Sequence, residues 1–144
     1  MGFPDRIERT VELAHPTEKV WAALTTAEGL ASWFGDEVTI DLRPGGSAEM
    51  RWIKEGFTAH MRVERVEPPA VFGFTWGVYG LPDEDPRRTY VEFTLEPVAA
   101  GTRLTVVESG FAQLPDPVYR KAFDGNTDGW RQALGQLADY LDAA

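Results

Sequence analysis

GWRQALGQLADYL, residues 129–141, places apolar side chains three and four positions apart near the end of the chain. This spacing aligns them along one side of an amphipathic α-helix. Phe123 continues the apolar side upstream, and Val118 and Tyr119 are candidates to extend it further. Because an apolar helix face is buried against another layer of structure, the rest of the chain has to supply that layer. The residues of the pattern are Trp130, Ala133, Leu134, Leu137, Ala138 and Leu141.

The preceding sequence supplies a sheet. From residue 37 to residue 109, apolar and polar residues alternate with a period of two, which is typical of strands with one buried face. Turn-forming residues at 43–46 and 54–56 and the proline pair at 68–69 interrupt the alternation, and we predict six strands. Residues 7–13 alternate in the same way and predict a first strand.

Two short helices are predicted between the first strand and the other six. Pro16 suits the first turn of a helix, and apolar residues recur at helical spacing over 20–24 and again over 27–34. The predicted order is strand, two short helices, six strands and one long helix, an α+β protein. The last helix is the only predicted element long enough to cover a curved antiparallel sheet, and the two short helices close one end.

The composition indicates one globular domain spanning residues 1–144. The chain has 144 residues, 43% of them apolar and 26% charged, and no cysteine. The absence of cysteine excludes disulfides, thiolate metal sites and cysteine nucleophiles, and only His15 and His60 are present, so we expect no metal and no cofactor. We find no apolar run of about twenty residues and no signal-peptide pattern, and predict a cytoplasmic protein.

The charge balance predicts which partners bind poorly. With 14 Lys and Arg against 23 Asp and Glu, the net charge is −9, which repels nucleic-acid phosphates and anionic lipid surfaces. We expect duplex DNA and anionic vesicles to show no appreciable binding at physiological salt, as measured by fluorescence anisotropy and by vesicle sedimentation. Micromolar binding that weakens with added salt would reveal a local basic patch and contradict this expectation.

The apolar rows of the predicted strands are rich in aromatic residues. Such a face is either a filled core or the wall of a small-molecule pocket, since pockets are typically apolar and aromatic with a few polar groups. Trp33 and Phe34 are either core residues or gate residues. Asn126 and Asp128 lie in the first part of the last helix, and one of them is expected to cap the helix or to face the mouth of a cavity. The candidate ligand-binding residues are Trp52, Met61, Phe74, Trp76, Phe93, Glu108 and Trp130.

Several motifs, in their order and spacing, resemble a known family. They are HPTEKVWAAL at 15–24, LASWF at 30–34, DLRPGG at 41–46 and VERVEPP at 63–69 leading into FGFTW at 72–76, with a weaker GW at 129–130. Together they resemble the SRPBCC superfamily, the helix-grip fold of START-type lipid-binding and birch-pollen-allergen-type proteins. Within it they are most similar to the branch named after the C-terminal domain of the heat-shock-protein-90 ATPase activator. The resemblance extends from about Ile7 to Leu141.

This resemblance implies a seven-stranded curved antiparallel sheet wrapped around the long C-terminal helix, with a largely apolar cavity between them. It does not imply a reaction, because the superfamily includes lipid carriers, polyketide cyclases, hydrolases and co-chaperone domains. The branch has no shared catalytic signature to transfer, so the catalytic residues, if any, remain unassigned.

Glu108 is the polar exception in the apolar rows. Alternation after Leu104 and Val106 directs its carboxylate inward, where a charge is costly unless it is paired. Arg9 has the analogous position in the first strand. If the first and last strands pair antiparallel, as the family fold implies, Arg9 and Glu108 meet on one face. The pair would then be a structural ion pair, a ligand-orienting pair, or the site of a general base.

Three functions follow from these features. The first is a binding protein for a small apolar or amphipathic molecule in the sheet–helix cavity. The second is a cyclase- or hydrolase-type enzyme that uses Glu108, with Tyr90, Tyr119 or His60, as acid or base. The third is a co-chaperone-like ATPase-activator module, which requires an exposed interface. A protein partner or a homodimer is left open. We rank binding first.

Overall fold

The computed structural model describes residues 5–78, 81–82 and 84–143, and its elements follow the predicted order. They are β1 (Arg6–Leu13), α1 (Thr17–Thr25), α2 (Ala27–Trp33), β2 (Glu37–Ile40), β3 (Ser47–Trp52), β4 (Phe57–Glu67), β5 (Val71–Gly77), β6 (Arg88–Val98), β7 (Gly101–Ser109), the 3₁₀-helix η1 (Phe111–Gln113) and α3 (Asp116–Ala143). The α+β prediction is confirmed.

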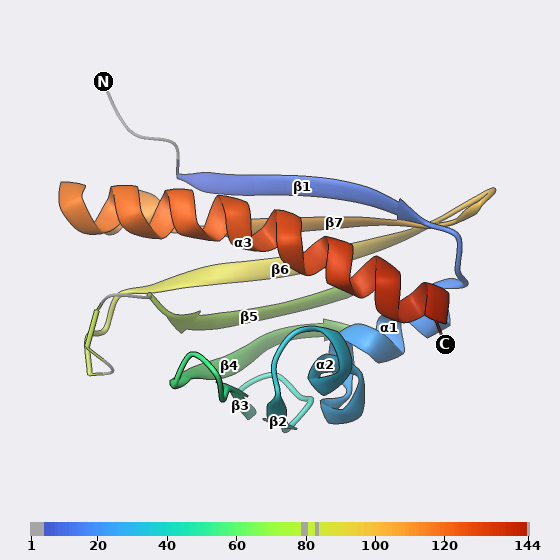
Figure 1. The fold of residues 1–144 in the computed structure, drawn as a ribbon, viewed down its shortest axis with the longest axis horizontal. Coiled ribbons are helices and arrows are strands. Elements are labelled where there is room, and N and C mark those ends of the chain that lie inside the picture. Colours follow the sequence, from blue (N-terminus) through green and yellow to red (C-terminus); the bar gives the residue numbers. More distant parts are fainter. Residues whose placement is uncertain (1–4, 79–80, 83, 144) are drawn as a thin grey trace.

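The seven described strands form one antiparallel sheet in the order β1-β7-β6-β5-β4-β3-β2. Strands β2 to β7 follow one another as a meander, and β1 pairs with β7 at the far edge, with Arg6 opposite Ser109 and Leu13 opposite Thr102. The sheet curves and α3 crosses its concave face, while α1 lies beside the C-terminal end of α3 and α2 lies nearer the middle of α3 (Figure 1). This arrangement is the helix-grip fold.

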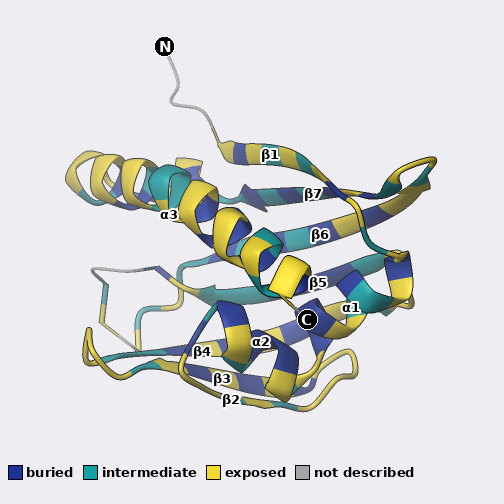
Figure 2. Ribbon diagram, turned by 45° about the vertical axis from the view of Figure 1, so that its right-hand side comes forward, coloured by how far each residue is buried: buried dark blue, intermediate teal, exposed yellow. Residues whose placement is uncertain are grey.

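Helix α3 buries one side against the sheet, and its opposite side is exposed (Figure 2). It begins at Asp116 and includes Val118, Tyr119 and Phe123 of the predicted upstream extension, although Gly125 and Gly129 each cost about 1 kcal/mol relative to alanine in a helix interior. Aromatic packing stabilises this first half. The Phe123 ring stacks on Tyr119 and meets Phe111 edge-on, both at a centroid distance of 5.3 Å.

The two short helices are held tightly together. The Thr26 side chain caps α2 by accepting a hydrogen bond from the Gly29 amide at 2.9 Å, and a Cβ at Gly29 would lie 2.5 Å from the Ala22 carbonyl oxygen. Trp33, the last residue of α2, donates its indole N–H to the Ala23 carbonyl at 2.8 Å. These contacts fix the end of α2 next to the middle of α3.

The convex face of the sheet carries charged side chains. Arg103 bridges Glu12 and Glu96, each at 3.0 Å, and Arg65 pairs with Glu67 and Glu92. The hydrogen bond from Arg65 lowers the pKa of Glu67. Exposed pairs of this kind add little stability, but they make the face polar, and α3 covers the other side. Among the described helices, none is both long and apolar enough to span a membrane.

Candidate functional site

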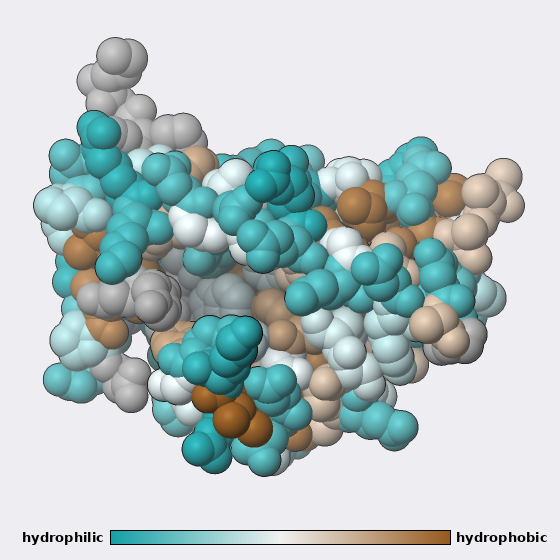
Figure 3. Space-filling model, viewed as in Figure 1, coloured by the Kyte–Doolittle hydropathy of each residue, from teal (hydrophilic) through white to brown (hydrophobic). Residues whose placement is uncertain are grey.

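A pocket of about 520 Å³ opens between α2, the turn joining β3 to β4, the end of β5 and the middle of α3. Figure 3 shows the molecular surface hollowed between the long helix and the elements below it. Its volume is within the range of about 300–1,000 Å³ that is usual for small-molecule sites. The residues that line it are Ala31, Ser32, Trp33, Phe34, Gly35, Asp36, Trp52, Lys54, Glu55, Trp76, Asn126, Gly129, Trp130, Gln132, Ala133 and Gln136.

Five aromatic rings from α2, β3, β5 and α3 form the pocket's apolar wall. Phe34 is central, with its ring centroid 4.9 Å from Trp33, 5.6 Å from both Trp52 and Trp130, and 6.1 Å from Trp76. The Trp76 and Trp130 rings are stacked with their centroids 5.9 Å apart. Trp52 donates its indole N–H to the Phe34 carbonyl at 2.8 Å, which ties β3 to the end of α2.

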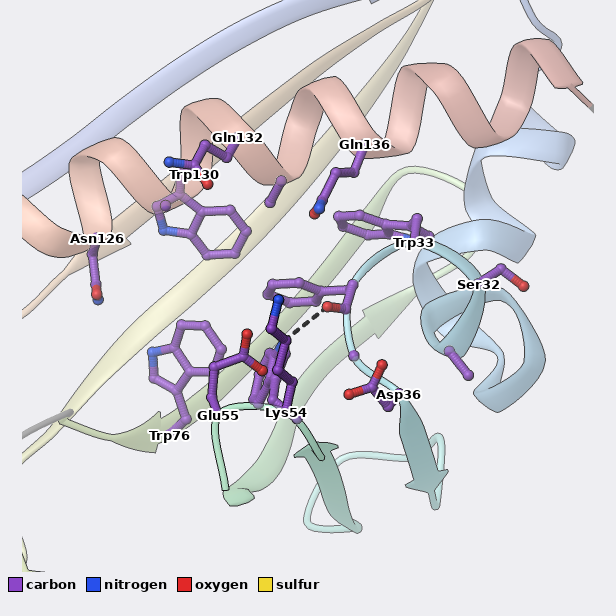
Figure 4. A pocket seen from close by; sticks show the side chains of 16 residues that line it. Ser32, Trp33, Asp36, Lys54, Glu55, Trp76, Asn126, Trp130, Gln132 and Gln136 are labelled. Carbon is purple, nitrogen blue, oxygen red and sulfur yellow. Dashed lines mark hydrogen bonds between the residues drawn. The ribbon is translucent and has the colours of Figure 1, made fainter. Parts of the chain in front are cut away.

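Polar groups surround these rings. Asn126, Gln132 and Gln136 come from α3, whereas Asp36, Lys54 and Glu55 come from the opposite side of the pocket (Figure 4). Asp36 accepts a hydrogen bond from the Ile53 amide at 2.7 Å, and this bond holds the β3–β4 turn against the segment after α2. The pocket therefore joins an aromatic wall to a polar and charged mouth.

Glu108 lies directly behind this wall, and its side chain is completely buried. Oε1 accepts hydrogen bonds from Trp130 Nε1 at 2.8 Å and Asn126 Nδ2 at 3.0 Å. Oε2 accepts from Trp76 Nε1 at 2.8 Å, Thr89 Oγ1 at 2.5 Å and Asn126 Nδ2 at 3.1 Å. Three of these four partners line the pocket or pack beside it, and all four are uncharged.

Both oxygens of Glu108 accept hydrogen bonds. An indole N–H and an amide NH₂ can only donate, so Oε1 is the acceptor for Trp130 and Asn126. Glu108 accordingly accepts from donors on β5, β6 and α3 and holds these three elements together.

The expected pairing of Glu108 with Arg9 does not form. Strands β1 and β7 are antiparallel neighbours, as the family fold implies, but the register places Ile7 opposite Glu108 and Arg9 opposite Val106. The carboxylate is instead saturated by donors from the central strands and from α3. The structural ion-pair hypothesis was therefore wrong about the partner, although the inward direction of Glu108 is confirmed.

The structure separates the predicted ligand-binding residues into three groups. Trp52, Trp76 and Trp130 line the pocket. Glu108 lies behind them, hydrogen-bonded to two of the three. The remaining three, which are nearly fully buried and do not line the pocket, are Met61, Phe74 and Phe93.

Sequence reasoning singled out Asn126 as a residue that could face the pocket but missed the rest of the polar lining. Gly129, Gln132, Ala133 and Gln136 have the i, i+3, i+4, i+7 spacing of a single helix stripe, and this stripe faces the pocket. This second stripe could have been recognised in the sequence, because it runs along the helix next to the apolar stripe. Asp36, Lys54 and Glu55 carry no comparable signal, because the strand order brings them to the pocket.

The three side chains considered as partners of Glu108 in acid–base chemistry lie elsewhere. Tyr90 is on the convex face, where its hydroxyl donates to Glu92 at 2.8 Å, and burial together with that carboxylate raises the pKa of Tyr90. His60 is exposed and lies 3.6 Å from Glu49. Tyr119 is buried on the inner side of the first half of α3. None of the three lines the pocket.

The sheet, the gripped helix and the pocket between them define an SRPBCC-type helix-grip protein. The chain belongs to the family of activator of Hsp90 ATPase homolog 1-like proteins, whose sequence profile matches residues 14–142. No curated protein matches the sequence.

Solved structures share the fold over nearly the whole chain. Protein MLL2253 from Mesorhizobium loti is 29% identical with a TM-score of 0.82, and the match covers 96% of this chain and 98% of that one. DynU16, from the dynemicin biosynthetic locus, is 27% identical with a TM-score of 0.80, and the match covers 96% of this chain and 48% of DynU16. Aha1 from Colwellia psychrerythraea, solved as a dimer, is 22% identical with a TM-score of 0.78 over 94% and 95% of the two chains, a likeness of fold.

Proposed function

We propose that this protein binds a small amphipathic molecule in the pocket between α2, the β3–β4 turn and α3. The observation that carries the proposal is the wall of five aromatic rings around a hollow of about 520 Å³. Aromatic and apolar surface supplies most of the affinity in small-molecule sites, and a few polar groups set orientation. Here the amides of Asn126, Gln132 and Gln136 are placed for that second role.

The burial and saturated hydrogen bonding of the Glu108 carboxylate favour binding over catalysis. Both of its oxygens already accept hydrogen bonds from the protein, and no part of the side chain is exposed. A general base has to come within hydrogen-bond reach of the proton it removes. Tyr90, His60 and Tyr119 lie outside the pocket lining, so none of these three side chains can act with Glu108 as an acid–base pair there.

Binding is also favoured over a protein-partner role. Among the described residues, the large apolar side chains that are exposed are Leu42, at 37%, and Ile53, at 58%. Two scattered apolar side chains are ordinary for a monomer surface and do not form an apolar patch of interface size.

A neutral fluorescent probe tests the proposal. N-phenyl-1-naphthylamine should bind the folded protein and quench tryptophan fluorescence, because four tryptophans line the pocket. Its binding should also raise the unfolding midpoint, since a ligand that binds only the native state stabilises it by mass action. Absence of probe binding, under conditions in which a known cavity protein responds, would refute the proposal.

Two glycines of α3 provide a matched pair of variants. Gly129 lines the pocket and Gly135 does not, and a Cβ at either position meets no atom within 4 Å. Gly129→Leu should fill part of the pocket and weaken probe binding at least tenfold. Gly135→Leu should leave probe binding unchanged. Both variants should fold, because leucine favours the helix over glycine by about 1 kcal/mol. Equal affinities in the two variants would place the probe elsewhere.

A further inference from the structure

A buried carboxylate lies behind the aromatic wall of the pocket, and among the residues that the structure describes no buried Lys or Arg balances it. Glu108 is fully buried, and its hydrogen-bond partners Trp76, Thr89, Asn126 and Trp130 are all neutral. A buried charge is normally paired with an opposite charge or a metal. From this arrangement we infer that the ligand is an organic cation, with a quaternary ammonium or protonated amine on an apolar body; the inference rests on the proposed binding function.

The two tryptophans that are hydrogen-bonded to Glu108 extend its electrostatic effect to the pocket. Trp76 and Trp130 point their indole N–H groups at the carboxylate, and their rings lie along the pocket (Figure 4). A cation held against the face of an indole, within about 6 Å of the ring centroid, is attracted by the negative potential of that face. Hydrogen bonds to a carboxylate increase electron density in the rings, which strengthens this attraction.

The other charged side chains at the pocket also include more acidic than basic groups. Asp36 and Glu55 contribute two carboxylates at the mouth, and Lys54 is the single basic residue among the lining side chains. Asp36, Glu55 and Lys54 are all exposed, so water screens their charges far more than the charge of Glu108, and the buried carboxylate carries the argument. The net charge of −9 adds a long-range preference for cations over anions.

Three probes with the same benzyl group isolate the effect of charge. Benzyltrimethylammonium is a cation, neopentylbenzene is its uncharged carbon isostere, and phenylmethanesulfonate carries a negative group of similar size. Dissociation constants come from tryptophan fluorescence and calorimetry at fixed ionic strength. We expect the cation to bind about tenfold more tightly than the neutral isostere, and the sulfonate to bind more weakly than both.

Two variants, at Glu108 and at Gln136, test whether the charges around the pocket cause the preference for the cation. Glu108→Gln should reduce the cation's advantage to threefold or less, measured as the ratio of the dissociation constants of neopentylbenzene and benzyltrimethylammonium in the same variant. Gln136→Lys adds a positive charge at an exposed position in the pocket lining, where folding is not at risk. This variant should raise the dissociation constant of the cation at least threefold, whereas the uncharged control Gln136→Met should not.

The outcomes separate this inference from the proposed function. If neopentylbenzene and N-phenyl-1-naphthylamine bind but the cation gains nothing over its isostere, the pocket binds ligands and the inference is overturned. A cation preference that survives in both Glu108→Gln and Gln136→Lys would also overturn it. If none of the neutral or cationic probes binds, the proposed function fails as well.

Discussion

Glu108→Leu is expected to lower the free energy of unfolding by about 3–5 kcal/mol, because it removes the acceptor for several buried donors at once. Each buried N–H left without a partner costs about 1–3 kcal/mol. Trp130 Nε1 loses its acceptor and the Asn126 amide, which donates to both oxygens, loses two, whereas Trp76 Nε1 keeps the Thr89 hydroxyl at 3.0 Å. Urea unfolding followed by circular dichroism measures the loss.

Glu108→Gln should be less harmful, with a loss of about 1–3 kcal/mol. An amide has one accepting oxygen, so whichever way it turns, its NH₂ group faces the N–H of Trp76 or of Trp130. A double-mutant cycle with Trp130→Phe provides the control, since Glu108→Leu should cost less once the indole N–H that donates to Oε1 is absent. A loss below about 1 kcal/mol for Glu108→Leu would show that the carboxylate does not hold β5, β6 and α3 together.

Leu137→Ala is expected to lower the free energy of unfolding by about 2–5 kcal/mol. Leu137 is completely buried where α3 packs on the concave face, and truncation leaves a cavity that the surrounding core fills only in part. The matched control is Asp139→Ala, which is exposed on the same helix and should stay within about 0.5 kcal/mol of the wild type. A change below about 0.5 kcal/mol for Leu137→Ala would contradict the packing of α3 on the sheet.

The fold was predictable because its signals are local. The spacing of Trp130, Leu134, Leu137 and Leu141 identified a helix with one buried side, and the alternation over residues 37–109 identified the strands and their inward faces. The same alternation predicted that Glu108 points inward, and its side chain is completely buried. A period of two or 3.6 specifies which way each side chain faces, and this information needs no contact with distant residues.

The candidate site was predictable only in part. Trp52, Trp76 and Trp130 were expected at the ligand and line the pocket, whereas Phe74 and Phe93 share their inward direction but lie in the core. Direction alone cannot separate the two groups. Whether an inward side chain meets a hollow or another side chain depends on the volumes contributed by the opposite layer, and residues far apart in sequence supply that layer.

The partners of Glu108 depended on the strand order and on the rotation of α3. Strand register put Ile7, and not Arg9, opposite Glu108. The neighbouring strands then brought Trp76 and Thr89 to the carboxylate, and the position of α3 brought Asn126 and Trp130. These contacts join residues 18 to 32 positions apart, and no local periodicity encodes them. Local pattern thus determined the elements and their buried faces, whereas long-range packing determined the pocket and the hydrogen bonds that hold a buried charge behind it.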